Sequence, residues 1–150
     1  FPVKDGEIKD YFLSQKVSEE KANELSSLSF GKPGRALDFY LNPEKMEEEK
    51  KIVSDLIKIS RFELSFRFQY VKSFSDLSAG NLKKILDIWL IYFRSALLSR
   101  FMGGKKTENF SHYSLFKIKK IIKNIQDTEF LISSFNVNLK SAFENLLIEM

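Results

Sequence analysis

Cysteine is absent from this 150-residue chain, and histidine occurs only once. The lack of cysteine excludes disulfides, thiolate metal sites and cysteine nucleophiles. A single histidine disfavours Ser-His-Asp chemistry and histidine-based metal sites, so the sequence predicts no metal site and no cofactor. No pair of carboxylates has a spacing that indicates acid–base catalysis. The sequence therefore favours a protein that is not an enzyme on its own.

Glycine (6 residues) and proline (3 residues) are also scarce, which favours long helices over a turn-rich all-β fold. The hydrophobic share of 43% is ordinary, and a net charge of +4 does not by itself indicate nucleic acid. The most apolar run, Ile88–Leu98, is interrupted by Arg94 and is too short to cross a bilayer. We therefore expect a cytoplasmic protein without membrane contact. Because the chain begins at Phe1 without a leader pattern, we also expect a piece of a longer protein.

Apolar residues recur with helical spacing along most of the chain, which predicts an all-α protein. The pattern favours a short three-helix piece over residues 1–42, followed by a bundle of about five helices over residues 43–150. Asn42 is expected to cap the helix that starts at Pro43, and Asn138 is expected to cap the last helix. We expect a break at residues 78–81, followed by a long helix. Gly103-Gly104 is expected to end that helix.

The run "RFELSFRFQYV" at residues 61–71 fits two patterns. Alternate residues are apolar, as in a strand, but aromatic residues also recur every four positions, namely Phe62, Phe66, Tyr70 and Phe74. No turn residue separates this run from the helix before it, so we predict a helix. Whether that helix continues the preceding one is left open.

The segment "SFGKPGRAL" at residues 29–37 has the glycines and basic residues of a phosphate-binding loop. A Walker loop, however, needs a buried strand before it and backbone N–H groups around the phosphates. Pro33 has no N–H, and no strand pattern precedes Gly31, so this interpretation fails. The segment instead predicts a junction of two helices at which Gly31 adopts a left-handed conformation. Arg35 would lie at a helix N-terminus, where a cation is disfavoured, so it should meet either a carboxylate or an external anion such as phosphate.

A basic cluster, "KIKKIIK", surrounds an isoleucine stripe with Lys117, Lys119, Lys120 and Lys123. These lysines are typical of the solvated face of an amphipathic helix. As an alternative, together with Lys105 and Lys106, they could contact nucleic-acid phosphates with a strong salt dependence. A base-stacking platform would require exposed aromatic residues among the basic ones. His112 is expected to be a surface or capping residue.

Three segments resemble a known family when they are taken in order. These are "SFGKPGRAL", "LDIWLIYFRSALLSR" at residues 86–100 and "NVNLKSAFENLLIEM" at residues 136–150. They are similar to segments of the delta-prime subunit of the bacterial DNA polymerase III clamp loader, and the resemblance covers the whole chain. The chain departs from the family at Ser95, where an aspartate is usual. The gamma/tau subunit is the nearest alternative, but its turn usually reads Gly-Ser-x-Arg-Asp-Ala.

The resemblance implies the end of an AAA+ lid domain (1–42) and a helical collar domain (43–150). In that family the turn with Gly31, Gly34 and Arg35 would be the sensor-2 element, although delta-prime is generally a subunit that does not hydrolyse ATP. The collar would bind other clamp-loader subunits, gamma/tau and delta, and DNA only indirectly through the complex, whereas the chain alone would be monomeric. Residues 62–74 and 85–101 carry more large side chains than one buried helix face needs, and this surplus gives candidate collar contacts. The candidates are Phe66, Tyr70, Trp89, Phe93, Arg94 and Phe101. A wide bundle core would explain the same residues.

Overall fold

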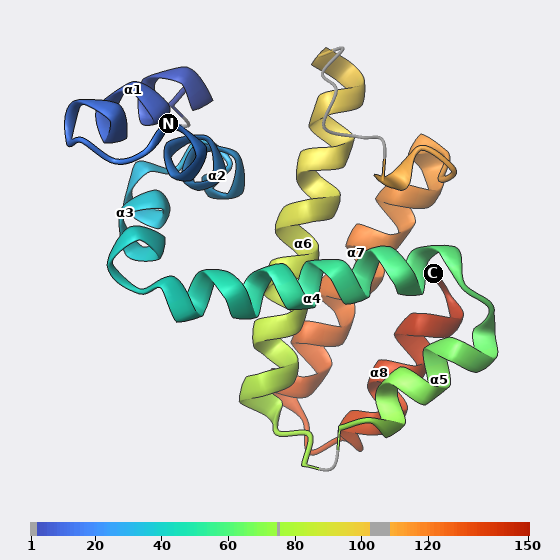
Figure 1. The fold of residues 1–150 in the computed structure, drawn as a ribbon. Helices are drawn as coiled ribbons and strands as arrows, with labels where there is room; N and C mark the ends of the chain where they lie inside the picture. The colour runs from blue at the N-terminus through green and yellow to red at the C-terminus, as the bar shows by residue number, and fades with distance from the viewer. Residues whose placement is uncertain (1–2, 75, 103–108) are drawn as a thin grey trace. The chain divides into compact units, whose positions relative to one another are not determined.

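The computed structural model describes residues 3–74, 76–102 and 109–150, and this part of the chain contains eight α-helices and no strand (Figure 1). The all-α prediction is therefore confirmed. The helices are α1 (Asp5–Ser14), α2 (Glu19–Ser29), α3 (Pro33–Leu41), α4 (Pro43–Arg61), α5 (Leu64–Lys72), α6 (Ala79–Met102), α7 (Leu115–Ser134) and α8 (Leu139–Ile148).

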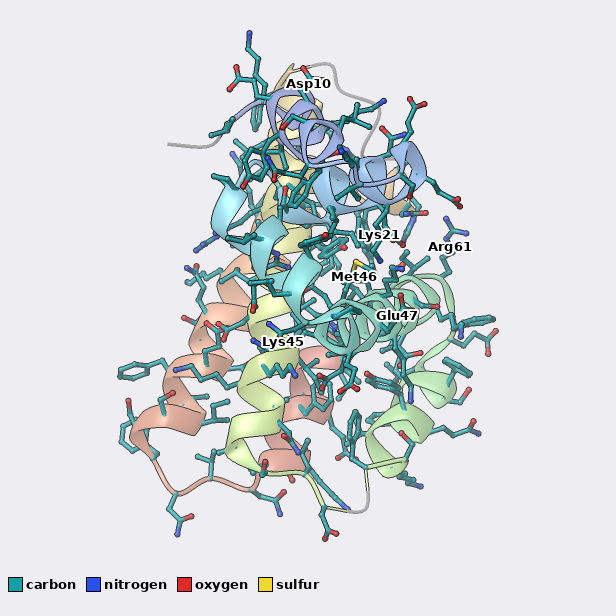
Figure 2. All side chains as sticks on the ribbon, turned by 60° about the vertical axis from the view of Figure 1, so that its left-hand side comes forward. Asp10, Lys21, Lys45, Met46, Glu47 and Arg61 are labelled. Carbon is teal, nitrogen blue, oxygen red and sulfur yellow. The ribbon has the colours of Figure 1, made fainter. Side chains whose placement is uncertain are left out.

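The chain divides into two compact units, unit 1 (Phe1–Lys50) and unit 2 (Lys51–Met150). This boundary lies inside α4, later than the expected boundary between residues 42 and 43. The reason is that the first turns of α4 complete unit 1. Met46 is fully buried in the core of that unit, and its sulfur lies 3.8 Å from the Lys21 ammonium (Figure 2).

Unit 1 has a small apolar core between α1, α2, α3 and the start of α4. Its buried members are Ile8, Phe12, Ala22, Leu25, Ala36, Phe39 and Met46. Ser18 caps α2 by accepting a hydrogen bond from the backbone of Lys21, as its residue type favours. At the other end, Phe30 (φ 51°) and Gly31 (φ 73°) both adopt the left-handed conformation, and Pro33 then starts α3. The predicted helix junction is thus present.

Unit 2 has a larger core in which α6 packs against α7 and α5 packs against α8. Trp89 and Phe93 on α6 are fully buried there, and the Trp89 ring lies 5.4 Å from the ring of Phe143 on α8. The prediction that Trp89 and Phe93 contact a neighbouring subunit is therefore wrong for this structure. They belong to a wide bundle core, which was the alternative explanation for these large side chains.

Two predicted helix ends differ in detail, and the continuity of the phenylalanine-rich helix, which the sequence left open, is decided. The phenylalanine-rich run is helical as predicted, but Phe62 and Glu63 separate α4 from α5. Residues 79–81 are helical, because Ser78 accepts a hydrogen bond from the backbone N–H of Asn81 and so begins α6. Asn42 does not provide the expected cap, since its side-chain amide donates back to Asp38 on α3. Asn138 does cap α8, and Gly103-Gly104 lies outside the described residues.

Candidate functional site

Arg35, the predicted anion-binding residue, is held within unit 1. Its Nη2 donates to the carboxylate of Glu49 on α4, and its Nε donates to the carbonyl of Leu28 at 3.3 Å. The guanidinium also lies 5.2 Å from the ring centre of Phe39 and 5.9 Å from that of Phe30. The Arg35 and Glu49 side chains are only 19% and 9% exposed. Of the two possibilities for Arg35, the structure shows the carboxylate partner.

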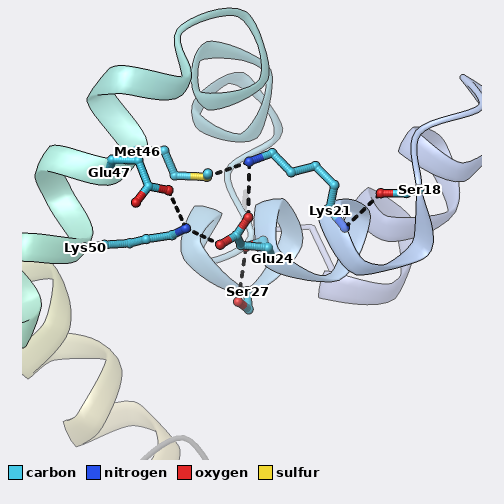
Figure 3. A network of polar contacts seen from close by, with 7 residues as sticks. All are labelled: Ser18, Lys21, Glu24, Ser27, Met46, Glu47 and Lys50. Carbon is cyan, nitrogen blue, oxygen red and sulfur yellow. Dashed lines mark hydrogen bonds and ion pairs between the residues drawn. The ribbon is translucent and has the colours of Figure 1, made fainter.

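A network of polar contacts joins α2 to the start of α4 (Figure 3). The Lys50 ammonium contacts Glu24 and, at 2.7 Å, Glu47, while Lys21 donates to Glu24 at 3.2 Å. The hydrogen bond from Lys50 lowers the pKa of Glu24, and the same contact raises the pKa of Lys50. These ion pairs are partly solvated, so each contributes little to the stability of unit 1.

A shallow apolar groove lies between α1 and α3 in unit 1. It has a volume of about 350 Å³ and is lined by Val3, Glu7, Ile8, Tyr11, Phe12, Pro33, Gly34 and Leu37. Glu7 is its single charged residue. The groove has no group of catalytic residues and no cluster of cations that would hold a phosphate.

Unit 2 exposes apolar side chains where α4 ends and α5 begins. Phe62 is 50% exposed and Phe66 is 37% exposed, and their ring centres are 4.6 Å apart. Leu64 lies between them in the chain and is also exposed. We call Phe62, Leu64 and Phe66 the α4–α5 surface. Such a cluster is typical of a contact with another protein.

The other candidate contact residues are distributed differently. Arg94 and Phe101 are exposed on α6, whereas Tyr70 is partly buried against the core, with its ring 6.1 Å from that of Phe143. Burial raises the pKa of the Tyr70 hydroxyl, with a smaller contribution from the nearby Asp55 carboxylate. The sequence list omitted Phe62 and Leu64. The apolar alternation at residues 62–70 contained both, but that alternation did not show which of them a helix would leave exposed.

The four lysines of the basic cluster separate into two pairs. Lys120 forms an ion pair with Glu149 at 2.6 Å, which lowers the pKa of Glu149, and Lys117 donates to the Glu149 carbonyl at 2.6 Å. A cation at that position also suits the C-terminus of α8. Lys119 instead lies over the exposed ring of Phe101, with Nζ 6.0 Å from its centre. Lys123 is exposed one turn further along α7. Lys105 and Lys106 lie outside the described residues.

Two carboxyl groups meet between α6 and α7. Partial burial raises the pKa of Glu129, the adjacent Asp87 raises it further, and Lys83 and Arg94 oppose the change. The Oε1 atom of Glu129 is buried and has no hydrogen-bond partner in the described structure.

His112 and Tyr113 both contact the Ser60 carbonyl, at 3.0 and 3.2 Å, near the end of α4. His112 is also exposed, so its position is compatible with the surface or capping role expected for it.

Within the described ranges, no three His, Asp or Glu residues are grouped closely enough to share a metal ion. Among the described helices, none has both the length and the apolar character that a membrane crossing requires. Comparison of the chain with models of protein families, with curated proteins and with solved structures gave no match.

Proposed function

We propose that this chain is a helical assembly module that binds other protein subunits and has no catalytic activity of its own. The observation that carries the proposal is the α4–α5 surface. Unit 2 already has a large buried core, yet Phe62, Leu64 and Phe66 remain exposed, and the rings of Phe62 and Phe66 contact each other. Exposing such a cluster gains nothing for folding, whereas burying it under a partner would contribute binding free energy.

In its specific form, the proposal is that the chain is the C-terminal part of a clamp-loader delta-prime subunit. Unit 2 would be the helical collar, and unit 1 would be the end of an AAA+ lid. The Gly31–Arg35 turn would then be a sensor-2 element whose arginine serves packing, since Arg35 pairs with Glu49. The partners of the chain would be the gamma/tau and delta subunits, and the chain would be located in the cytoplasm. The rival within the family is a gamma/tau subunit itself.

Size exclusion with light scattering tests this role. We expect the chain to be monomeric alone and to form a defined complex with the collar domains of gamma/tau and delta. The double variant Phe62→Ser/Phe66→Ser should weaken that complex by roughly 10- to 100-fold, as loss of a hot spot does. A matched control is Phe130→Ser/Phe135→Ser, because these rings are also exposed and contact each other at 6.1 Å on unit 2.

Two results would contradict the proposal. If no complex forms with either collar, the clamp-loader form is wrong. If a complex forms but the Phe62/Phe66 and Phe130/Phe135 variants weaken it equally, the α4–α5 surface is not the contact.

A further inference from the structure

A second exposed surface of unit 2 combines aromatic rings with lysines. Phe116 on α7 is 79% exposed and Phe101 on α6 is 64% exposed. Lys119 connects them, since it lies one helical turn after Phe116 and its ammonium is above the Phe101 ring. Lys123 follows one turn later on the same face of α7. We call Phe101, Phe116, Lys119 and Lys123 the Phe–Lys surface.

The two lysines of this surface are not neutralised by the chain's described acids. No ion pair joins Lys119 or Lys123 to a described carboxylate, whereas the adjacent Lys117 and Lys120 are occupied by Glu149. Asp127, one turn beyond Lys123, marks the end of the basic stretch. The surface therefore offers two cations that have no ion-pair partner among the described residues, and two open rings, over about 10 Å of helix.

We propose that the Phe–Lys surface binds single-stranded nucleic acid. Unstacked bases would stack on Phe101 and Phe116, and the phosphates between them would contact Lys119 and Lys123. Exposed aromatic rings beside a track of cations are the combination by which sequence-tolerant binding of single strands works. The proposal does not rest on the assembly role, because the α4–α5 surface uses other residues.

The same residues fit other partners less well. The centre of a protein interface is usually depleted of lysine, but here Lys119 lies over the Phe101 ring and Lys123 follows it one turn later on α7. A helix that lies on a membrane presents a broad apolar face, whereas the apolar face of α7 is buried in the core through Ile118, Ile121 and Ile125. On the Phe–Lys surface, the exposed rings of Phe101 and Phe116 lie beside the Lys119 cation, which matches separate bases joined by phosphates.

Fluorescence anisotropy of the whole chain tests the proposal with labelled oligothymidylate and oligouridylate of about 15 nucleotides. We expect binding at about 50 mM salt that falls steeply towards about 200 mM. The variants Phe101→Ala and Phe116→Ala should each weaken binding by roughly 5- to 100-fold. Lys119→Gln/Lys123→Gln should lower the slope of log affinity against log salt by about 1.4, at about 0.7 for each lost phosphate contact.

Matched controls separate this surface from general charge attraction. Phe130→Ala removes an exposed ring from the same helix, and Lys72→Gln/Lys140→Gln removes two exposed cations from elsewhere on unit 2. Both controls should bind as the unchanged chain does. Circular dichroism should show the same helix content in every variant, since all of the substituted side chains are exposed.

Three results would overturn the proposal. The first is no binding of either oligonucleotide at low salt. The second is binding that the phenylalanine variants leave unchanged, or that a duplex shows equally well, because stacking would then play no part. The third is sedimentation with anionic lipid vesicles, lost in Phe116→Ala, without binding of oligonucleotides. That outcome would assign the surface to a membrane instead. A preference between the two oligonucleotides would distinguish DNA from RNA as the source of the strand.

Discussion

At Arg35, a cation near the N-terminus of α3 is stabilised by contacts from outside that helix. The helix dipole opposes a positive charge there. The Glu49 carboxylate, the Leu28 carbonyl and the Phe39 ring compensate for it. Because the pair is largely buried, neither partner is well solvated. The residue therefore connects the α2–α3 junction to the start of α4.

Replacing this arginine tests its structural role. Arg35→Ala removes the guanidinium partner of Glu49, so we expect the free energy of unfolding of unit 1 to fall by about 2 kcal/mol or more. The control Lys32→Ala, at an exposed position in the same turn, should change it by less than about 0.5 kcal/mol. Amide hydrogen exchange in α2 and α3 measures the change in stability for both variants. Equal exchange in the two variants would show that Arg35 is not structural.

Glu129 gives a prediction about pH. Its pKa is raised in the folded state by burial and by Asp87, so folding favours the protonated form. The contribution of protonated Glu129 to the free energy of unfolding is present in full below the pKa that Glu129 has in the unfolded chain. It is lost as pH rises through the pKa that Glu129 has in the folded protein. Glu129→Gln, which stays neutral, should therefore stabilise unit 2 at about pH 7 by roughly 0.5 kcal/mol, the size of a like-charge contact. The gain should disappear at about pH 3, where glutamate is also neutral.

Thermal unfolding at the two pH values measures this effect. Asp76→Asn, which neutralises an exposed carboxylate in the segment before α6, should show no comparable gain. A stabilisation by Glu129→Gln that is the same at both pH values would contradict the assignment, because it would not come from ionisation.

At the scale of elements, the junction between α2 and α3 depends on one glycine more than on the other. Gly31 has φ 73°, where a Cβ atom is strained, whereas Gly34 is helical and has nothing within 4 Å of an added Cβ. We expect Gly31→Ala to destabilise unit 1 by roughly 1 kcal/mol and Gly34→Ala to stabilise it by about 0.5 kcal/mol. Urea unfolding followed by circular dichroism measures both changes, and changes of the same sign would contradict this account.

The helices could be predicted from the sequence because their apolar spacing repeats over several turns. Asn138 and Gly31 also behaved as their residue types suggest, since their roles depend on backbone geometry within a few residues. The end of α4 and the boundary between the units could not be predicted. The boundary between the units depends on tertiary contacts, such as the burial of Met46 and the pairing of Glu49 with Arg35 across 14 positions of the chain.

The candidate surfaces were less predictable than the helices. The sequence predicted Phe66 and Phe101 as contact residues, and both are exposed. It also predicted Trp89 and Phe93 as contact residues, although both are buried. Periodicity gives the faces of one helix, whereas burial on α6 depends on which neighbours cover it. Equally, no local pattern distinguished Lys120, which pairs with Glu149, from Lys119, which lies over Phe101.

At the scale of the whole molecule, α4 runs through both compact units, so each unit takes part of its core from the same helix. Unit 1, with its 50 residues, is near the lower size limit for an independently stable core. Unit 2 has 100 residues and many more buried apolar side chains. We therefore expect the two units to differ in stability, with unit 1 the first to unfold.

A single tryptophan makes this difference measurable, because Trp89 is buried in unit 2 and its fluorescence reports on that unit alone. Leu25→Ala, in the core of unit 1, should cost about 2 to 4 kcal/mol there. In a urea titration, the early part of the helix signal should then move to lower denaturant while the midpoint of the Trp89 fluorescence stays in place. Ile121→Ala, in the core of unit 2, should do the reverse. If Leu25→Ala lowers both midpoints equally, α4 joins the units into one cooperative structure, and the two units do not unfold separately.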